Sequence, residues 1–284
     1  MAYISVRGVD HYYEWIPEVR TIGKPVLVFI HGWGGSARYW RSTAIALSAD
    51  FDCLLYDLRG FGRSKLPIPT PKISYDLEEY AVDLAILLDN LGVENIYLNG
   101  HSVGASIATF FVNLYSDRVQ RAILTCSGLF TYEAKSFAAF HKFGGYVVKF
   151  RPQWFLSIPF AGQLFMARFL HQPQPESIAK EFLADFLAAD YEAALGTIYT
   201  SVSKHAAEVM PQEFAKISMP TLLVAGEKDI IIPAEMGKAA ASFSPKVEYY
   251  EIPATAHFPM LEEADIYLAK VRQFLGVAVN SRSQ

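Results

Sequence analysis

The sequence predicts an α/β fold, in which a mostly parallel sheet is covered by helices on both faces and interrupted once by a helical insertion. Short, wholly apolar strands alternate with segments of helical periodicity, as expected for strands buried on both faces. A Gly-x-Ser-x-Gly turn joins one of these strands to an Ala-rich helix. The alternation stops over residues 130–211 and then resumes. We therefore expect a core domain of residues 1–129 and 212–284, and an inserted domain of residues 130–211.

The first half of the chain predicts a hairpin followed by alternating strands and helices. Turn residues separate the two hairpin segments, and Gly92 ends the longest helical pattern. The hairpin strands are expected over 3–7 and 11–15, and further strands over 26–30, 51–56, 119–125 and from residue 96 into the Gly-x-Ser-x-Gly turn. Helices are expected over 38–48 and 76–91 and directly after that turn.

The segment of residues 130–211 is predicted to form a helical cap, or lid. Residues 130–171 hold 12 aromatic residues among 42, and five Lys or Arg against the single acid Glu133. Prolines divide this stretch, which suits short cap helices better than one long helix, although extra core is the alternative. Helices are expected over 176–190 and 191–210. After the cap, we expect strands over 219–225 and 247–252, a helix after Pro233, a last helix over 259–275 and a loose tail after Gly276.

Composition excludes several classes of function. The chain has 284 residues, 52% of them hydrophobic, and a net charge of −4, so nothing indicates a nucleic-acid partner. The two cysteines, Cys53 and Cys126, lie in apolar runs and predict buried free thiols rather than a disulfide or a metal site. No signal peptide and no bilayer-length apolar run are evident, so we expect a cytoplasmic protein. The sequence does not indicate the oligomeric state.

Ser102 is the predicted nucleophile. A serine on a tight strand-to-helix turn adopts a strained backbone, and its neighbours at two positions on either side, Gly100 and Gly104, must then be small. The turn exposes the hydroxyl and directs the N-terminus of the next helix at the same point.

A serine hydroxyl needs a general base, which is itself oriented by a carboxylate. These partners should lie on loops at the carboxyl ends of parallel strands, and two late loops supply Asp229 and His257. Glu227 is the nearest rival for the acid. His257 is the single histidine on a late strand-end loop; His31 and His101 sit beside glycines, where a role in holding the loop is expected.

Acyl transfer also needs N–H donors for an oxyanion. The amide of Val103, directly after the nucleophile, is one candidate, and the amide of Trp33 in the glycine-rich loop after residues 26–30 is the other. That loop lacks the Lys-Ser/Thr signature of a phosphate-binding loop and the spacing of a dinucleotide-binding loop.

The motifs together resemble the α/β-hydrolase fold family, over about residues 25–275. The resemblance rests on His31-Gly32, Asp57-Leu58-Arg59-Gly60-Phe61-Gly62-Arg63-Ser64, Gly100-His101-Ser102-Val103-Gly104, Gly226-Glu227-Lys228-Asp229 and His257-Phe258-Pro259. It implies an eight-stranded sheet with antiparallel first strands, a cap after the sixth strand, and serine hydrolase chemistry with no cofactor and no metal. It also implies a structural role for the 57–64 loop. Some members place the acid after the strand over 119–125, but that segment has no carboxylate.

The expected function is a serine esterase, similar to carboxylesterases or lipases, acting on a small apolar ester. The serine excludes the members of the family that use an aspartate nucleophile. Carbon–carbon bond hydrolases, thioesterases, perhydrolases and small-molecule receptors of this fold share the triad and remain alternatives. The aromatic cap favours an apolar substrate, and its positive charge raises the alternative of contact with a membrane surface.

Overall fold

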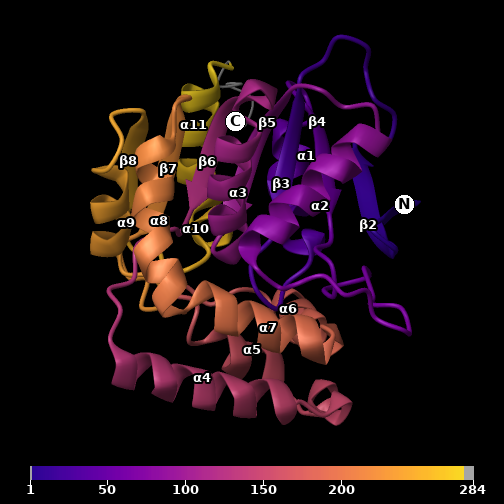
Figure 1. Ribbon diagram of the computed structural model, residues 1–284, viewed down its shortest axis with the longest axis vertical. Helices are drawn as coiled ribbons and strands as arrows, with labels where there is room; N and C mark the ends of the chain where they lie inside the picture. Colours follow the sequence, from indigo (N-terminus) through magenta and orange to yellow (C-terminus); the bar gives the residue numbers. More distant parts are fainter. Residues whose placement is uncertain (1, 278–284) are drawn as a thin grey trace.

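The computed structural model describes residues 2–277, which form one eight-stranded sheet with helices on both faces (Figure 1). The strand order is β1-β2-β4-β3-β5-β6-β7-β8. Strands β1 and β2 are antiparallel to their neighbours, and all other pairs are parallel, as expected. The strands are β1 (Ala2–Val6), β2 (Val9–Ile16), β3 (Val26–Ile30), β4 (Asp52–Tyr56), β5 (Ile96–His101), β6 (Val119–Thr125), β7 (Thr221–Gly226) and β8 (Val247–Ile252).

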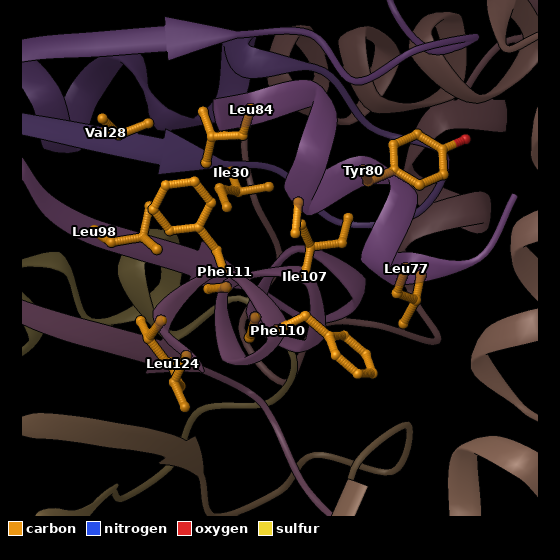
Figure 2. Close-up of a cluster of buried hydrophobic side chains, with 14 of the residues drawn as sticks. Val28, Ile30, Leu77, Tyr80, Leu84, Leu98, Ile107, Phe110, Phe111 and Leu124 are labelled. Atoms are coloured by element: carbon orange, nitrogen blue, oxygen red, sulfur yellow. The ribbon is translucent and has the colours of Figure 1, made fainter. Parts of the chain in front are cut away.

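The central strands are apolar throughout because each of their two faces meets a layer of helices. Alternate side chains of a strand point to opposite faces. Val28 and Ile30 of β3 therefore pack under one helix layer (Figure 2), whereas Leu27 and Phe29 pack under the other. The first layer contains α2 (Leu77–Asn90), α3 (Val103–Leu114), α8 (Lys204–Lys216) and α9 (Ala234–Ala241), and the second contains η1 (Ala37–Trp40), α1 (Arg41–Leu47) and α11 (Ala264–Leu275).

The segment between β6 and β7 is helical, but its division differs from the expectation. It contains α4 (Ala134–Lys149), η3 (Gln153–Ser157), α5 (Ala161–Met166), α6 (Glu176–Ala188), α7 (Tyr191–Ser201) and α8. The single helix expected over 191–210 is two helices, because the Ser203 hydroxyl accepts a hydrogen bond from the Ala206 N–H at 3.0 Å and starts α8 anew. The predicted last helix over 259–275 is likewise divided, into α10 (Pro259–Glu262) and α11.

Helix α8 spans residue 211, the predicted end of the inserted domain, and packs in the core layer. Phe214 of α8 is fully buried in the same apolar cluster as α3. The Asn113 amide of α3 also donates to the Glu213 carbonyl at 2.8 Å. The other helices of this segment, α4–α7, end before residue 203.

Helices α4–α7 lie beyond the carboxyl ends of the parallel strands, with α4 outermost (Figure 1). Helices α6 and α7 are attached to the core loops below them. The Trp33 indole donates to the Ala194 carbonyl at 2.9 Å, and the Leu66 N–H donates to the Asp190 carboxylate at 2.7 Å. Within residues 2–277 no helix has the length and apolar character needed to cross a bilayer.

Candidate active site

The turn after β5 has the strained geometry that its sequence predicts. Ser102 has φ 54° and ψ −122°, a region that side chains rarely occupy. A methyl group on Gly100 would lie 2.4 Å from the Gly104 carbonyl oxygen, and one on Gly104 would lie 2.5 Å from the His31 carbonyl oxygen. Both glycines are therefore required by backbone contacts that cannot move aside. The turn holds Ser102 half-exposed at the start of α3.

Asp229 and His257 meet at the ends of β7 and β8. The Nδ1 of His257 donates to Oδ2 of Asp229 at 2.7 Å, and each residue is 4% exposed. The other carboxylate oxygen accepts the N–H groups of Ile231 at 2.8 Å and Ile232 at 3.0 Å. Because a carboxylate only accepts, Nδ1 carries the proton and Nε2 is left with a lone pair. The rival acid, Glu227, is exposed and binds Lys228 and the Ala254 N–H instead.

Ser102 directly follows His101, a residue packed against His257, although the Ser102 hydroxyl forms no hydrogen bond to that histidine. The neighbouring His101 ring lies 4.8 Å from the His257 ring, measured between centroids. Among residues 2–277 no hydrogen bond of the Ser102 hydroxyl is formed. Such contacts are often long in ligand-free sites and shorten when substrate binds.

The loop after β3 lies directly against Ser102. A methyl group on Gly32 would approach the Ser102 Cβ to 3.2 Å, so the loop backbone forms one wall of the site. The His31 ring holds this loop by accepting the Leu58 N–H at 2.9 Å and contacting the Gly32 carbonyl at 2.8 Å. Val103 is the first residue of α3, where N–H groups have no partner within the helix. Its amide and that of Trp33 are the two candidate oxyanion donors.

A buried chain of hydrogen bonds, here called the relay, connects the loop after β3 to the loop of residues 253–258 that carries His257, the histidine loop. Tyr39 lies at the centre of this relay, and the sequence did not indicate it. The Nε2 of His101 donates to the His257 carbonyl at 2.7 Å, so its Nδ1 accepts the Tyr39 hydroxyl proton at 2.9 Å. The Tyr39 oxygen in turn accepts the Gly32 N–H at 2.5 Å. Burial and the adjacent His257 lower the pKa of His101 well below its usual value, which keeps the ring neutral as the relay requires.

Glu262 is a second residue that sequence reasoning missed. Its buried carboxylate accepts the N–H groups of Ala256 at 2.9 Å and Phe258 at 3.4 Å on the histidine loop. It also accepts those of His171 at 2.6 Å and Gln172 at 2.8 Å, which lie between α5 and α6 in the inserted segment. Glu262 therefore joins the histidine loop to that segment. Four backbone donors have no signature in the sequence, so no pattern could have indicated this role.

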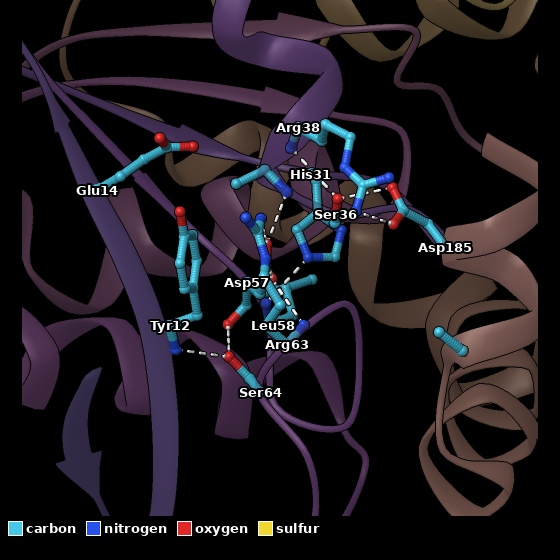
Figure 3. A network of polar contacts seen from close by, with 12 residues as sticks. Tyr12, Glu14, His31, Ser36, Arg38, Asp57, Leu58, Arg63, Ser64 and Asp185 are labelled. Carbon is cyan, nitrogen blue, oxygen red and sulfur yellow. Dashed lines mark hydrogen bonds and ion pairs between the residues drawn. The ribbon is translucent and has the colours of Figure 1, made fainter. Parts of the chain in front are cut away.

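Asp57 and Asp185 form the polar attachments around the loop after β3 (Figure 3). Asp57 accepts the Ala37 N–H at 2.8 Å and pairs with Arg63 at 2.6 Å, which fits the structural role expected of its loop. Asp185 of α6 accepts the Ser36 hydroxyl at 2.6 Å. Burial raises the pKa of Asp185 to about 6, although the Ser36 hydrogen bond and Arg38 oppose the shift.

Cys53 and Cys126 are both buried free thiols. Cys126 lies near the site, where its Sγ and ring nitrogens of His101 and His257 lie within 4.8 Å of one another. Both nitrogens of His101 are already in hydrogen bonds. Burial also raises the pKa of Cys126 well above its usual value and opposes the thiolate that a metal would need. These atoms fit a hydrogen-bonded relay better than a metal site.

The surroundings of the site are apolar, but fewer aromatic residues of the segment 130–171 contribute than the sequence suggested. Phe169 lies over the histidine loop and accepts the His257 N–H on its carbonyl at 2.9 Å. The cluster of Leu183, Phe186 and Leu187 packs against Trp33. By contrast, seven of the 12 aromatic side chains of residues 130–171 are exposed on the outside: Tyr132, Phe140, Phe143, Tyr146, Phe150, Trp154 and Phe160.

Comparison with known proteins agrees with this architecture. A family model described as alpha/beta hydrolase fold matches residues 25–264. The chain belongs to this family. Membership makes the chain an α/β hydrolase, and the family spans several reactions.

The relatives illustrate that spread. A protein of Pseudomonas savastanoi pv. phaseolicola, provisionally named carbamate hydrolase RutD, is 28% identical over 78% of this chain and 82% of its own length. The bifunctional esterase/perhydrolase DCH of Acinetobacter calcoaceticus is 25% identical over 93% of this chain and 96% of its own. The enol-lactonase structure from Burkholderia xenovorans LB400 shares the fold with a TM-score of 0.79 at 21% identity, covering 97% of this chain and 100% of that one.

Proposed function

We propose that this α/β hydrolase is a serine hydrolase that cleaves an ester-type bond of a small, largely apolar substrate. The observation that carries the proposal is the bond between His257 Nδ1 and Asp229 at 2.7 Å, beside the strained Ser102. That bond fixes the histidine tautomer whose free Nε2 can accept a proton.

In the proposed reaction, His257 Nε2 takes the Ser102 hydroxyl proton while Oγ attacks the substrate carbonyl carbon. The carbonyl oxygen becomes an oxyanion, which the Val103 and Trp33 amides stabilise. The tetrahedral intermediate collapses, the C–O bond to the leaving group breaks, and protonated His257 gives its proton to the departing alkoxide. Water then enters, loses a proton to His257 and releases the acid from Ser102 by the same steps in reverse.

The inserted helices α4–α7 act as the cap in this proposal. Their inner apolar side chains, Leu183 and Phe186, face Trp33 and favour an apolar acyl or aromatic group over a sugar. Two of the relatives carry esterase or lactonase in their names, which supports ester-type cleavage.

The test is turnover of a panel of p-nitrophenyl esters of increasing acyl length, run with wild type, Ser102→Ala and the matched control Ser106→Ala. Ser106 is a half-buried serine one helical turn later in α3. We expect Ser102→Ala to lower kcat by up to about 10⁶-fold, as removal of a triad serine does elsewhere, and Ser106→Ala to retain activity. Full turnover by Ser102→Ala would refute the nucleophile. One slow turnover that leaves a stable adduct would favour a receptor over an enzyme.

A further inference from the structure

The outer side of α4 bears a row of large aromatic side chains that the proposed reaction does not use. Phe143 is 64% exposed, Phe150 at the end of the helix is 71% exposed, and Trp154 in η3 is 60% exposed. Tyr146 is exposed on the same helix. Exposed rings cost solvation free energy, and several large exposed apolar side chains on one helix mark a candidate binding site.

Helical periodicity separates this row from the side of α4 that packs on the protein. The inner line is Phe137, Gly144 and Val148, which are buried. Gly144 lies against α7, where an added methyl group would come within 3.1 Å of Ile198. At 3.6 residues per turn, Phe143 and Phe150 are two turns apart and point away from that line. The rings of Phe143 and Phe150 therefore point away from the packed side of α4 because of the helix periodicity, not by chance exposure of one ring.

A row of lysines runs beside the aromatic row. Lys135, Lys142 and Lys149 recur at intervals of seven residues, so they align along the helix. All three are exposed, and none forms an ion pair within residues 2–277. Residues 134–175 contain no Asp or Glu at all. The face thus combines large apolar rings with unneutralised positive charge.

We propose that this face of α4, with Phe150 and Trp154, docks on the surface of an anionic lipid bilayer. In this arrangement the aromatic rings enter the headgroup region, and the lysine row binds the anionic headgroups. Helix α4 is outermost in the molecule, so no other element obstructs the contact (Figure 1). The docked cap would lie between the bilayer and the strand ends that hold the candidate site.

Charge favours a bilayer over a second copy of the chain. A two-fold contact through the same face would bring two lysine rows together, and the segment of residues 134–175 supplies no acid to neutralise them. An anionic bilayer instead gains attraction from every lysine.

The test measures binding to vesicles and does not depend on catalysis. We would use the Ser102→Ala protein throughout, so that hydrolysis cannot alter the lipid, and measure co-sedimentation with vesicles of phosphatidylcholine alone or mixed equally with phosphatidylglycerol. One variant replaces Lys135, Lys142 and Lys149 by Gln. Its matched control replaces Lys72, Lys238 and Lys246, three exposed lysines elsewhere, by Gln.

A second variant tests the rings, with Phe143→Ser, Phe150→Ser and Trp154→Ser. Its control is Ile68→Ser, Leu114→Ser and Phe243→Ser, which removes exposed apolar side chains from other surfaces. Thermal unfolding midpoints check that each variant folds.

We expect binding to the anionic vesicles at low salt that falls at high salt, because the attraction is screened. At about fivefold per lysine, the lysine variant should bind on the order of a hundredfold more weakly. The aromatic variant should also lose binding, and both controls should bind as the parent does. The proposal would be overturned if variants and controls bound equally, or if the parent did not bind anionic vesicles. It would also be overturned if the parent bound no vesicles but formed a concentration-dependent dimer that the aromatic variant lost.

Discussion

Removal of the Glu262 carboxylate is expected to weaken both the fold and the site. In Glu262→Ala, four backbone N–H groups lose their acceptor at once. Those of His171 and Gln172 lie near the surface and can bind water instead, whereas those of Ala256 and Phe258 stay buried. A buried N–H without an acceptor costs about 1–3 kcal/mol, and the Phe258 bond is weak, so we expect a loss of about 3 kcal/mol in the free energy of unfolding.

The same substitution should lower kcat because Glu262 positions the loop that carries His257. Displacement of a reacting group by about 1 Å can cost a hundredfold, so we expect a fall of about ten- to a hundredfold in kcat. Urea unfolding followed by circular dichroism measures the stability, and p-nitrophenyl ester turnover measures kcat. Glu262→Gln, which keeps one accepting oxygen, should lie between wild type and Glu262→Ala.

Glu235→Gln removes the same charge from an exposed position on α9 and serves as the control. If Glu262→Ala unfolds like Glu235→Gln and keeps its kcat, the proposed link between the histidine loop and the inserted segment is wrong.

Three further predictions concern the residues around the site. Asp229→Asn should lower kcat by about 10⁴-fold with the fold intact, because an amide no longer fixes the histidine tautomer; an unchanged kcat on p-nitrophenyl esters would argue against Asp229. The folded state holds the Asp185 proton up to about pH 6 while the unfolded state releases it near 3.8, so this group makes stability fall as pH rises between those values. Urea unfolding at several pH values measures this dependence of stability on pH. In Asp185→Asn, where Ser36 can still donate to the amide, the fall in stability over that pH range should be smaller than in wild type. The same dependence in both proteins would contradict the assignment to Asp185. Tyr39→Phe leaves the Gly32 N–H without its acceptor and should lower kcat by roughly tenfold with little change in KM, whereas a change in KM alone would refute a positioning role.

The features predicted correctly from the sequence are those that local physics determines. Gly100 and Gly104 are fixed by backbone contacts within a few residues of Ser102, so the pentapeptide alone indicates the turn. Strand-end position indicated Asp229 and His257, because parallel strands deliver their following loops to one edge of the sheet. Their catalytic roles remain predictions, whereas their contact at 2.7 Å is a feature of the structure.

The features missed depend on contacts between distant segments. Glu262 lies in a short helix and resembles a surface acid, yet its partners are backbone donors up to 91 residues away. Tyr39 of η1 looks like ordinary core because its hydroxyl partner, His101, lies 62 residues away at the end of β5. The aromatic residues of the inserted segment favour an apolar substrate in the sequence, yet Phe143 and Tyr146 of α4 are exposed on the outside because α4 packs on α7 through Gly144.

The central claim is that Ser102 is a nucleophile activated by His257 and Asp229. Its most direct test is peptide mass spectrometry after treatment with a fluorophosphonate, which reacts covalently with activated serines. The account predicts one phosphonate adduct, on the peptide that contains Ser102, forming rapidly in wild type and very slowly in Asp229→Asn. An adduct on another residue, no adduct in folded protein, or equal labelling rates in both proteins would contradict it.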